Sequence, residues 1–189
     1  MLSINDLKNG ILIKIDQDPY VVMSVKHLHM GRGGSSIQTK IRNLKTGQVY
    51  ERNFKPADEF KEAEVDKIKS RFLCESRGQY WFDEISNPKR RFFLKTDEIV
   101  ESVQFLKPNL EVLAIKFNDN IINIELPIKA DYKVVEAPPA IRGDTAQGGT
   151  KTVIIEGGAK ISVPLFINEG DIIKINTQIG EYVERIKKG

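Results

Sequence analysis

Short runs of alternating apolar and polar residues, separated by turn residues, fill most of the chain. Alternation over 4–8 residues is typical of half-buried strands, and a sustained helical period is nearly absent. The strands predicted in this way cover residues 11–15, 20–28, 37–44, 49–54, 71–76, 79–83, 92–94, 111–117, 120–125, 131–136, 152–155, 160–164, 172–176 and 182–186. Many short strands at regular spacing predict an all-β fold of closed sheets, because barrels remove exposed strand edges.

Two breaks in the pattern divide the chain into three parts. The charged stretch 56–64 precedes a new set of strands, and Leu126-Pro127 closes that set. We therefore predict three consecutive small β-barrels as domains 1–64, 65–127 and 128–189. Each holds about 60 residues, which is near the lower limit for an independent core, so packing between barrels is expected. A polar loop, 140–151, is predicted inside the third domain.

Positive charge is concentrated near the N-terminus. Residues 26–55 contain seven Lys or Arg and one acidic residue, in a chain whose formal net charge is only +3. A basic patch of this kind favours a polyanionic partner such as nucleic acid. The plain alternative is a solvated strand face on which Lys40 and Arg42 occupy alternate positions.

The turn between strands 20–28 and 37–44 carries one cation among glycines. Its residues include Gly31, Arg32, Gly33 and Gly34, so the side-chain-poor loop of a long hairpin presents a single guanidinium. Glycine permits the backbone conformations of tight turns and close approach to a partner. We interpret the hairpin as an arm directed at something negative, and the alternative is a turn with a solvated arginine.

Composition excludes several classes of protein. A single cysteine, Cys74, excludes an internal disulfide framework, and no apolar run approaches the ~20 residues of a membrane span. No charged start precedes an apolar segment of signal-peptide length. We therefore expect a cytoplasmic protein with no membrane contact.

Catalytic and metal-binding patterns are scarce. His27 and His29 alternate along a predicted strand, but Cys74 is the one soft ligand that could join them, so no metal site is predicted. No catalytic triad, phosphate-binding loop or dinucleotide fingerprint occurs, so we predict no catalytic residues, no cofactor and no enzyme. Residues 80–82, Tyr-Trp-Phe, are either a base-stacking platform or core of the middle barrel, and alternation favours the core.

Several ordered segments carry a more specific signal. They are the glycine-rich loop 143–151, the segment 157–171 with its strand ending at Pro164, the turn 180–183, Asp18-Pro19-Tyr20, Phe54-Lys55, residues 80–82, Phe105-Leu106-Lys107 and Glu125-Leu126-Pro127. In residue identity and order they resemble the bacterial elongation factor P family over the whole chain. The third-domain signature departs at Val153, where that family usually has alanine.

The resemblance implies a fold and a function. It implies an SH3-like (KOW-like) barrel followed by two OB-fold barrels in an L-shaped arrangement. It also implies a monomeric translation elongation factor that binds the 70S ribosome between the P and E sites, beside peptidyl-tRNA and especially prolyl-tRNA. Its expected effect is to stimulate peptide-bond formation at consecutive prolines.

Arg32 occupies the position where many members of that family carry a lysine extended by β-lysylation. Other members carry an arginine there that is rhamnosylated or left bare, and the residue is directed toward the CCA end of the tRNA. The glycines at 33 and 34 favour the bare form, whereas rhamnosylation would require a modifying enzyme acting on Arg32. Met30 replaces a common proline and predicts a looser tip.

Two further groups of site residues follow from the resemblance. Lys40 and Arg42 are expected to contact phosphates of the tRNA backbone. The loop facing the small subunit and the E-site codon is expected to use Arg142, Gly143, Asp144, Thr145, Gly148 and Gly149. Without the resemblance, Asp144 and Thr145 fit a self-contained turn.

Other functions remain as alternatives. A general single-strand RNA chaperone built from the same barrels would use Arg32 as one of many phosphate contacts. A glycosyltransferase or nuclease lacks an acid and base pair. The archaeal and eukaryotic relative that carries hypusine is disfavoured, because it has two domains and a lysine at the tip.

Overall fold

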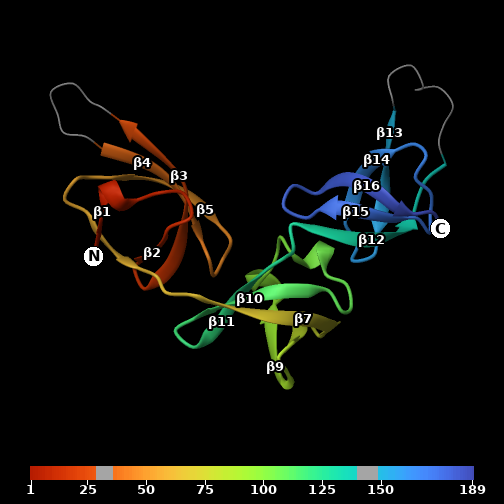
Figure 1. Cartoon of the computed structure of the whole chain (residues 1–189), viewed down its shortest axis with the longest axis horizontal. Helices are drawn as coiled ribbons and strands as arrows, with labels where there is room; N and C mark the ends of the chain where they lie inside the picture. The colour runs from red at the N-terminus through yellow and green to blue at the C-terminus, as the bar shows by residue number, and fades with distance from the viewer. Residues whose placement is uncertain (29–35, 140–148) are drawn as a thin grey trace. The chain divides into compact units, whose positions relative to one another are not determined.

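The computed structural model describes residues 1–28, 36–139 and 149–189, and strands dominate these residues (Figure 1). They form three sheets that succeed one another along the chain. Each sheet combines antiparallel hairpins of consecutive strands with pairs between strands that are distant in sequence, such as β1 with β6 and β12 with β15. The predicted all-β fold of small curled sheets is confirmed.

The first sheet has the strand order β1-β6-β2-β3-β4-β5. Its strands are β1 (Leu2–Ser3), β2 (Leu12–Ile15), β3 (Asp18–Leu28), β4 (Ser36–Asn43), β5 (Val49–Phe54) and β6 (Glu59–Glu62). Along β4, alternate residues turn inward, as a period of two requires. Ile13, Val22 and Ile41 are fully buried at the centre of the core.

Two strands of this sheet, β1 and β6, were not predicted. Residues 59–62 lie in the charged stretch that we interpreted as a break, yet β6 pairs with both β1 and β2. Phe60 explains the difference, because its ring is buried and lies 4.7 Å from that of Phe54, centroid to centroid. The charged neighbours of Phe60 point to solvent. A strand with a single buried position shows no apolar alternation, so the sequence pattern did not predict it.

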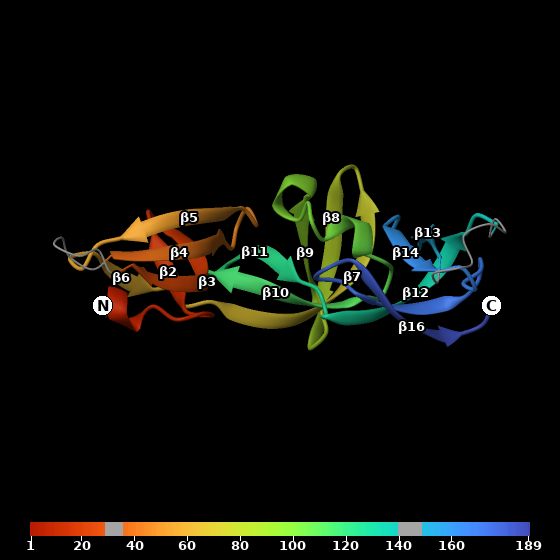
Figure 2. The same ribbon diagram turned by 90° about the horizontal axis from the view of Figure 1, so that it is seen from above.

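The middle sheet has the order β11-β10-β7-β8-β9. Its strands are β7 (Asp66–Ser76), β8 (Gln79–Glu84), β9 (Asn87–Lys95), β10 (Glu111–Phe117) and β11 (Asn120–Glu125), and β7, β8 and β9 are labelled in Figure 2. Short 3-10 turns at Thr96–Glu98 and Val103–Phe105 follow β9. β7 and β9 extend well beyond the predicted 71–76 and 92–94, because their polar ends alternate too weakly to be recognised.

The third sheet has the order β14-β13-β12-β15-β16. Its strands are β12 (Lys129–Glu136), β13 (Thr150–Ile155), β14 (Lys160–Pro164), β15 (Ile172–Asn176) and β16 (Glu181–Lys187). The outer strands β14 and β16 also contact each other, so the sheet curls toward a closed barrel. Tyr132, Val134 and Ile173 are fully buried in its core.

By its internal contacts the chain forms two compact units. One comprises residues 1–68, 94–100 and 114–124, and the other comprises 69–93, 101–113 and 125–189. The residues of the middle sheet are thus divided between the two units, and the predicted boundaries after residues 64 and 127 stay predictions. Within the described ranges, no helix is long and apolar enough to span a bilayer.

Each unit has its own tie between segments distant in sequence. In the first, Phe117 and Ile122 of the β10–β11 hairpin pack with Ala63, and Asn123 Nδ2 donates to the Leu44 carbonyl at 3.0 Å. In the second, Phe105 enters the core of the third sheet, where its carbonyl accepts a hydrogen bond from the buried Tyr132 hydroxyl at 2.9 Å. The 103–107 segment is therefore part of the third core.

Candidate nucleic-acid interface

The outer face of the β3–β4–β5 ribbon carries the basic residues singled out in the sequence. On β4, Ile37, Thr39 and Ile41 are buried, whereas Lys40 is exposed and Arg42 is half-buried on the opposite face. Lys40 pairs in register with Ser24 of β3 and Glu51 of β5. The predicted alternation, with Lys40 and Arg42 sharing the outward face, is therefore confirmed.

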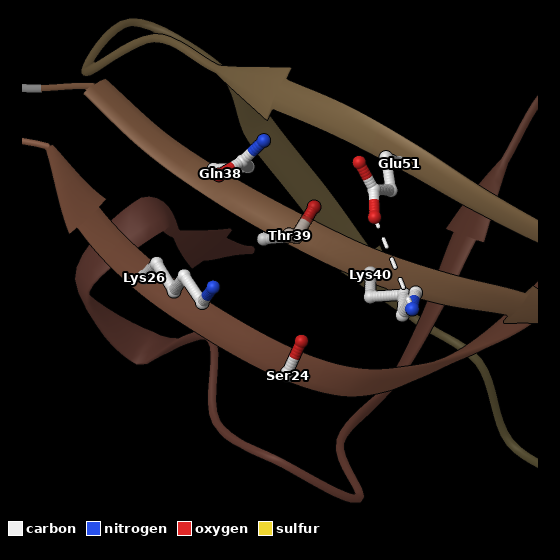
Figure 3. A pocket seen from close by; sticks show the side chains of 6 residues that line it. All are labelled: Ser24, Lys26, Gln38, Thr39, Lys40 and Glu51. Atoms are coloured by element: carbon white, nitrogen blue, oxygen red, sulfur yellow. Dashed lines mark ion pairs between the residues drawn. The ribbon is translucent and has the colours of Figure 1, made fainter.

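A shallow hollow lies on this ribbon, with a volume of about 90 Å³. Figure 3 shows its lining, which comprises Ser24, Lys26, Gln38, Thr39, Lys40 and Glu51. Ser24 and Lys26 come from β3, whereas Gln38, Thr39 and Lys40 come from β4. On β5, Glu51 Oε1 lies 3.9 Å from Lys40 Nζ. The hollow thus combines two ammonium groups with hydroxyl and amide groups that can bind phosphate or sugar oxygens.

Lys26 is a site residue that sequence reasoning did not select. It pairs with Gln38 in the β3–β4 register and its side chain is exposed. The sequence contained a pattern that could have identified it, because Lys26 shares a face with Ser24 on β3 and with Gln38 and Lys40 on β4. It was missed because the register of a hairpin with a bulge, here between Val22 and Ser24, cannot be counted from the sequence.

Local contacts hold two cations near this ribbon in fixed positions. Arg42 Nε donates to the Gly47 carbonyl at 3.0 Å, which holds the guanidinium against the β4–β5 turn. Lys45 is paired with Asp18, and its hydrogen bond lowers the pKa of that carboxyl. The exposed cations Lys26 and Lys40 are consequently better placed for a new anion than Arg42 or Lys45.

The arginine of the hairpin loop lies outside the described residues. Gly31, Arg32, Gly33 and Gly34 fall in the range 29–35, as do His29 and Met30. The last described pair of the hairpin is Leu28 with Ser36, and it lies two residues beyond the Lys26–Gln38 pair. The loop therefore starts and ends directly beside the lysine-lined ribbon.

The predicted codon-facing loop is described only at its ends. Arg142, Gly143, Asp144, Thr145 and Gly148 lie outside the described residues, whereas Gly149 is half-buried directly before β13. Lys151 Nζ donates to the Pro138 carbonyl at 3.0 Å. This bond ties together the two chain segments from which the loop departs.

The aromatic residues 80–82 divide between the two faces of β8. Phe82 is fully buried and stacks on Phe92 at 5.3 Å, as the core interpretation predicted. Trp81 points to the other face, is only half-buried and contacts Phe93, so the core interpretation is wrong for this residue. Among the described residues, no three His, Cys, Asp or Glu side chains gather as a metal site would require.

Family models match both ends of the chain. The elongation factor P KOW-like domain matches residues 3–60, and the elongation factor P C-terminal domain matches residues 131–185. An elongation factor P from Moorella thermoacetica is 37% identical over 98% of this chain and 100% of that protein. One from Endomicrobium trichonymphae is 39% identical over 98% of this chain and 100% of its own length. The chain belongs to the elongation factor P family.

Elongation factor P membership makes the chain a translation elongation factor, and it implies association with the ribosome. The matched KOW-like domain contains the basic ribbon, and the matched C-terminal domain contains the 140–148 loop. A solved eukaryotic translation initiation factor 5A from Methanococcus jannaschii has a TM-score of 0.47 at 16% identity, covering 65% of this chain and 94% of that one.

Proposed function

We propose that the chain binds the 70S ribosome between the P and E sites, beside peptidyl-tRNA, and stimulates peptide-bond formation at consecutive prolines. The observation that carries this proposal is family membership over the full length, combined with an arginine at the loop position of a lysine-lined hairpin. The factor is not itself the catalyst of peptide transfer. It acts in the cytoplasm, as a monomer of three domains and without a cofactor.

Arg32 is the residue that we assign to the CCA end of the tRNA. A guanidinium is charged at every physiological pH and makes bidentate contacts to phosphate, so a bare arginine is sufficient to hold the acceptor end. Fixing that end in a productive geometry lowers the entropic part of the barrier for the slow proline nucleophile. Gly31, Gly33 and Gly34 leave room for the backbone to approach the RNA.

Arg32 is also the candidate modification site. The glycines that follow it favour an unmodified arginine, and a host enzyme that rhamnosylates Arg32 is the alternative. The mass of the Arg32-containing peptide from natively produced protein distinguishes the two. An added deoxyhexose overturns the bare-arginine assignment and leaves the role of the loop in place.

The lysine-lined ribbon supplies the contacts to the tRNA backbone. Lys40 and Arg42 are assigned to this role from the family, and the exposure of Lys26 beside them supports its addition. Phosphate contacts of this kind fix orientation without reading sequence, and each one releases counterions. Binding should therefore weaken steadily as salt rises.

The loop between β12 and β13 is assigned to the small subunit and the E-site codon. Its proposed contact residues are Arg142, Gly143, Asp144, Thr145, Gly148 and Gly149. Lys151, through its bond to the Pro138 carbonyl, supports this role by holding the base of the loop together. Asp144 and Thr145 offer the hydrogen-bonding groups, and the glycines allow close contact with RNA.

Binding measurements separate this proposal from a general RNA chaperone. The proposal predicts tight binding to 70S ribosomes with peptidyl-tRNA in the P site and a vacant E site, and much weaker binding to vacant ribosomes or free RNA. A chaperone would bind arbitrary RNA with comparable affinity. Equal affinity for the programmed ribosome and for free RNA would overturn the proposal.

A further inference from the structure

The face of the middle sheet that carries Trp81 presents an aromatic surface to solvent. Trp81 on β8 and Phe93 on β9 lie with ring centroids 5.1 Å apart and planes at 45°. Phe93 keeps 41% of its surface exposed, although the opposite face of the same strands is well filled by Phe82 and Leu94. A large exposed aromatic beside a second ring is a common mark of a binding surface.

The cations beside these rings follow the same alternation. Along β9, Lys89 and Arg91 share the parity of Phe93, and both are exposed. Neither is held in an ion pair by any described residue. Asp83, a carboxylate on this face, is buried and accepts a hydrogen bond from Arg71 Nη2 at 2.8 Å. The surface therefore combines two aromatic rings with two uncompensated positive charges.

We propose that this face of β8 and β9 is a second RNA contact, at which unpaired bases stack on Phe93 and Trp81 while their phosphates contact Lys89 and Arg91. All four residues belong to one compact unit, and β8 and β9 are adjacent in the sheet (Figure 2). Charge complementarity selects single-stranded RNA over an apolar protein surface. Bases can reach the rings when the strand is unpaired, and stacking tolerates any base.

This contact is separate from the hairpin of Arg32 and independent of its action at proline codons. Two rings and two cations predict weak, salt-dependent binding of free oligonucleotides, with Kd of about 10 µM to 1 mM at low salt. Such a surface adds to the affinity of a factor already anchored elsewhere on the ribosome. It suits an RNA single strand or an unpaired loop rather than a duplex.

Trp81 is the one tryptophan of the chain, so its fluorescence reports on this face. The experiment titrates the full chain with U8 and A8 oligoribonucleotides and an eight-base-pair duplex, at 50 and 200 mM salt. Anisotropy of a labelled U8 is recorded in parallel. We expect quenching of Trp81 by the single strands, weaker binding at the higher salt, and a smaller effect of the duplex.

Variants decide whether the rings and cations carry the binding. Phe93→Ala should weaken U8 binding about tenfold or more, and Phe93→Leu should weaken it similarly, because a leucine keeps apolar area but cannot stack. Arg91→Ala should weaken binding severalfold and lower its salt dependence. Phe166→Ala is the matched control, since Phe166 is an exposed aromatic in the turn after β14, with Arg185 over its ring at 5.0 Å.

Three results would overturn the proposal. They are the absence of saturable binding up to about 1 mM U8 at 50 mM salt, equal binding by Phe93→Ala and the parent chain, and full retention of binding by Phe93→Leu. Full retention by Phe93→Leu would show that apolar area, and not stacking, binds the oligonucleotide. A separate sedimentation result, self-association that Phe93→Ala abolishes, would indicate that a second copy of the chain occupies this face instead of RNA. Arg32→Ala must leave U8 binding unchanged, which separates this test from that of the hairpin.

Discussion

At the scale of single residues, Gly157 and Gly158 show how one motif can hold two different constraints. Their φ angles are nearly equal, +99° and +96°, in a region that side chains rarely adopt. A Cβ on Gly157 would meet the Gln104 and Leu106 carbonyl oxygens at 2.8 and 2.9 Å, whereas one on Gly158 would meet nothing within 4 Å. Gly157 therefore packs directly against the 103–107 segment, whereas Gly158 is constrained by its φ angle alone.

Gly157→Ala should therefore destabilise the protein far more than Gly158→Ala. The control variant incurs backbone strain alone, about 1–2 kcal/mol, because only its φ is unfavourable. Gly157→Ala adds a clash with two backbone carbonyls, which we expect to cost about 1–3 kcal/mol more, as overpacking does. Urea unfolding followed by circular dichroism measures both. Equal losses in the two variants would contradict the packing role of Gly157.

Asp171 makes the third sheet sensitive to acid. Its side chain is 1% exposed and accepts hydrogen bonds from the Asn168 and Gly189 amides at 3.0 and 2.9 Å, with Arg185 Nη1 at 3.4 Å. Burial alone would raise the pKa of Asp171, but these donors outweigh it and the pKa is lowered. A lowered pKa contributes stability above the unfolded value of ~3.9, and that stability is lost as pH falls through the folded value.

Asp171→Asn should accordingly lower the free energy of unfolding at pH 7 by about 1–3 kcal/mol, because an amide cannot accept from all three donors. The difference from the parent chain should shrink as pH falls below about 4. Asp119→Asn is the control, since that carboxylate is 95% exposed beside Lys116. Thermal unfolding from pH 7 to 3 tests this. A gap between Asp171→Asn and parent that stayed constant with pH would argue against the account.

Residue roles were only partly predictable. Alternation placed Lys40 and Arg42 on one face, but the bond from Arg42 to the Gly47 carbonyl depends on a turn whose geometry no pattern encodes. Trp81 and Phe82 were interpreted together, although adjacent residues on a strand must point to opposite faces. Arg32 and the loop residues around Asp144 are predictions from sequence that lie outside the described ranges.

At the scale of elements, the 103–107 segment is fastened to the third sheet by three groups. The Tyr132 hydroxyl donates to the Phe105 carbonyl, and Lys107 Nζ donates to the Asp131 carbonyl and pairs with Glu156 at 3.0 Å. The same ammonium lies 5.1 Å from the centre of the Tyr132 ring. Phe105-Leu106-Lys107 is therefore a segment that docks on the third sheet, with a physical role for both its phenylalanine and its lysine.

Tyr132→Phe should destabilise the unit that contains residues 125–189. Removal of the hydroxyl leaves the Phe105 carbonyl without its donor in a buried place, which costs about 1–3 kcal/mol. The matched control is Tyr182→Phe, because the Tyr182 hydroxyl has no hydrogen bond to a described residue. Hydrogen exchange should show faster opening around residues 103–107 in Tyr132→Phe alone. Unchanged exchange there would mean that the bond does not hold the segment.

Strands were predictable where two or more apolar residues alternate. Segments 111–117, 120–125, 160–164 and 172–176 appear with the predicted bounds as β10, β11, β14 and β15. β6 was missed because a single buried phenylalanine among charged residues shows no alternation. β1 was missed because two residues are too few to show a period. Pairing with distant strands, rather than local pattern, determines both.

At the scale of the whole molecule, the account rests on a positively charged ribbon that meets RNA. Lys26→Ala and Lys40→Ala should each weaken ribosome binding and reduce the slope of log K against log salt by about 0.7–0.9 for each phosphate that is no longer neutralised. Lys61→Ala is the control, because Lys61 is exposed on β6, away from the hollow. Binding isotherms at several salt concentrations measure the slopes. Identical slopes for all three variants would show that the ribbon does not contact RNA phosphates.

The most direct test of the central claim is the rate of peptide formation on a template encoding three consecutive prolines. The reconstituted bacterial system contains no factor, the unmodified chain, or its Arg32→Ala variant, with a proline-free template as the control. We predict that the chain speeds the proline template alone and that Arg32→Ala loses this effect while folding normally. Rescue by Arg32→Ala equal to that of the parent chain would contradict the account.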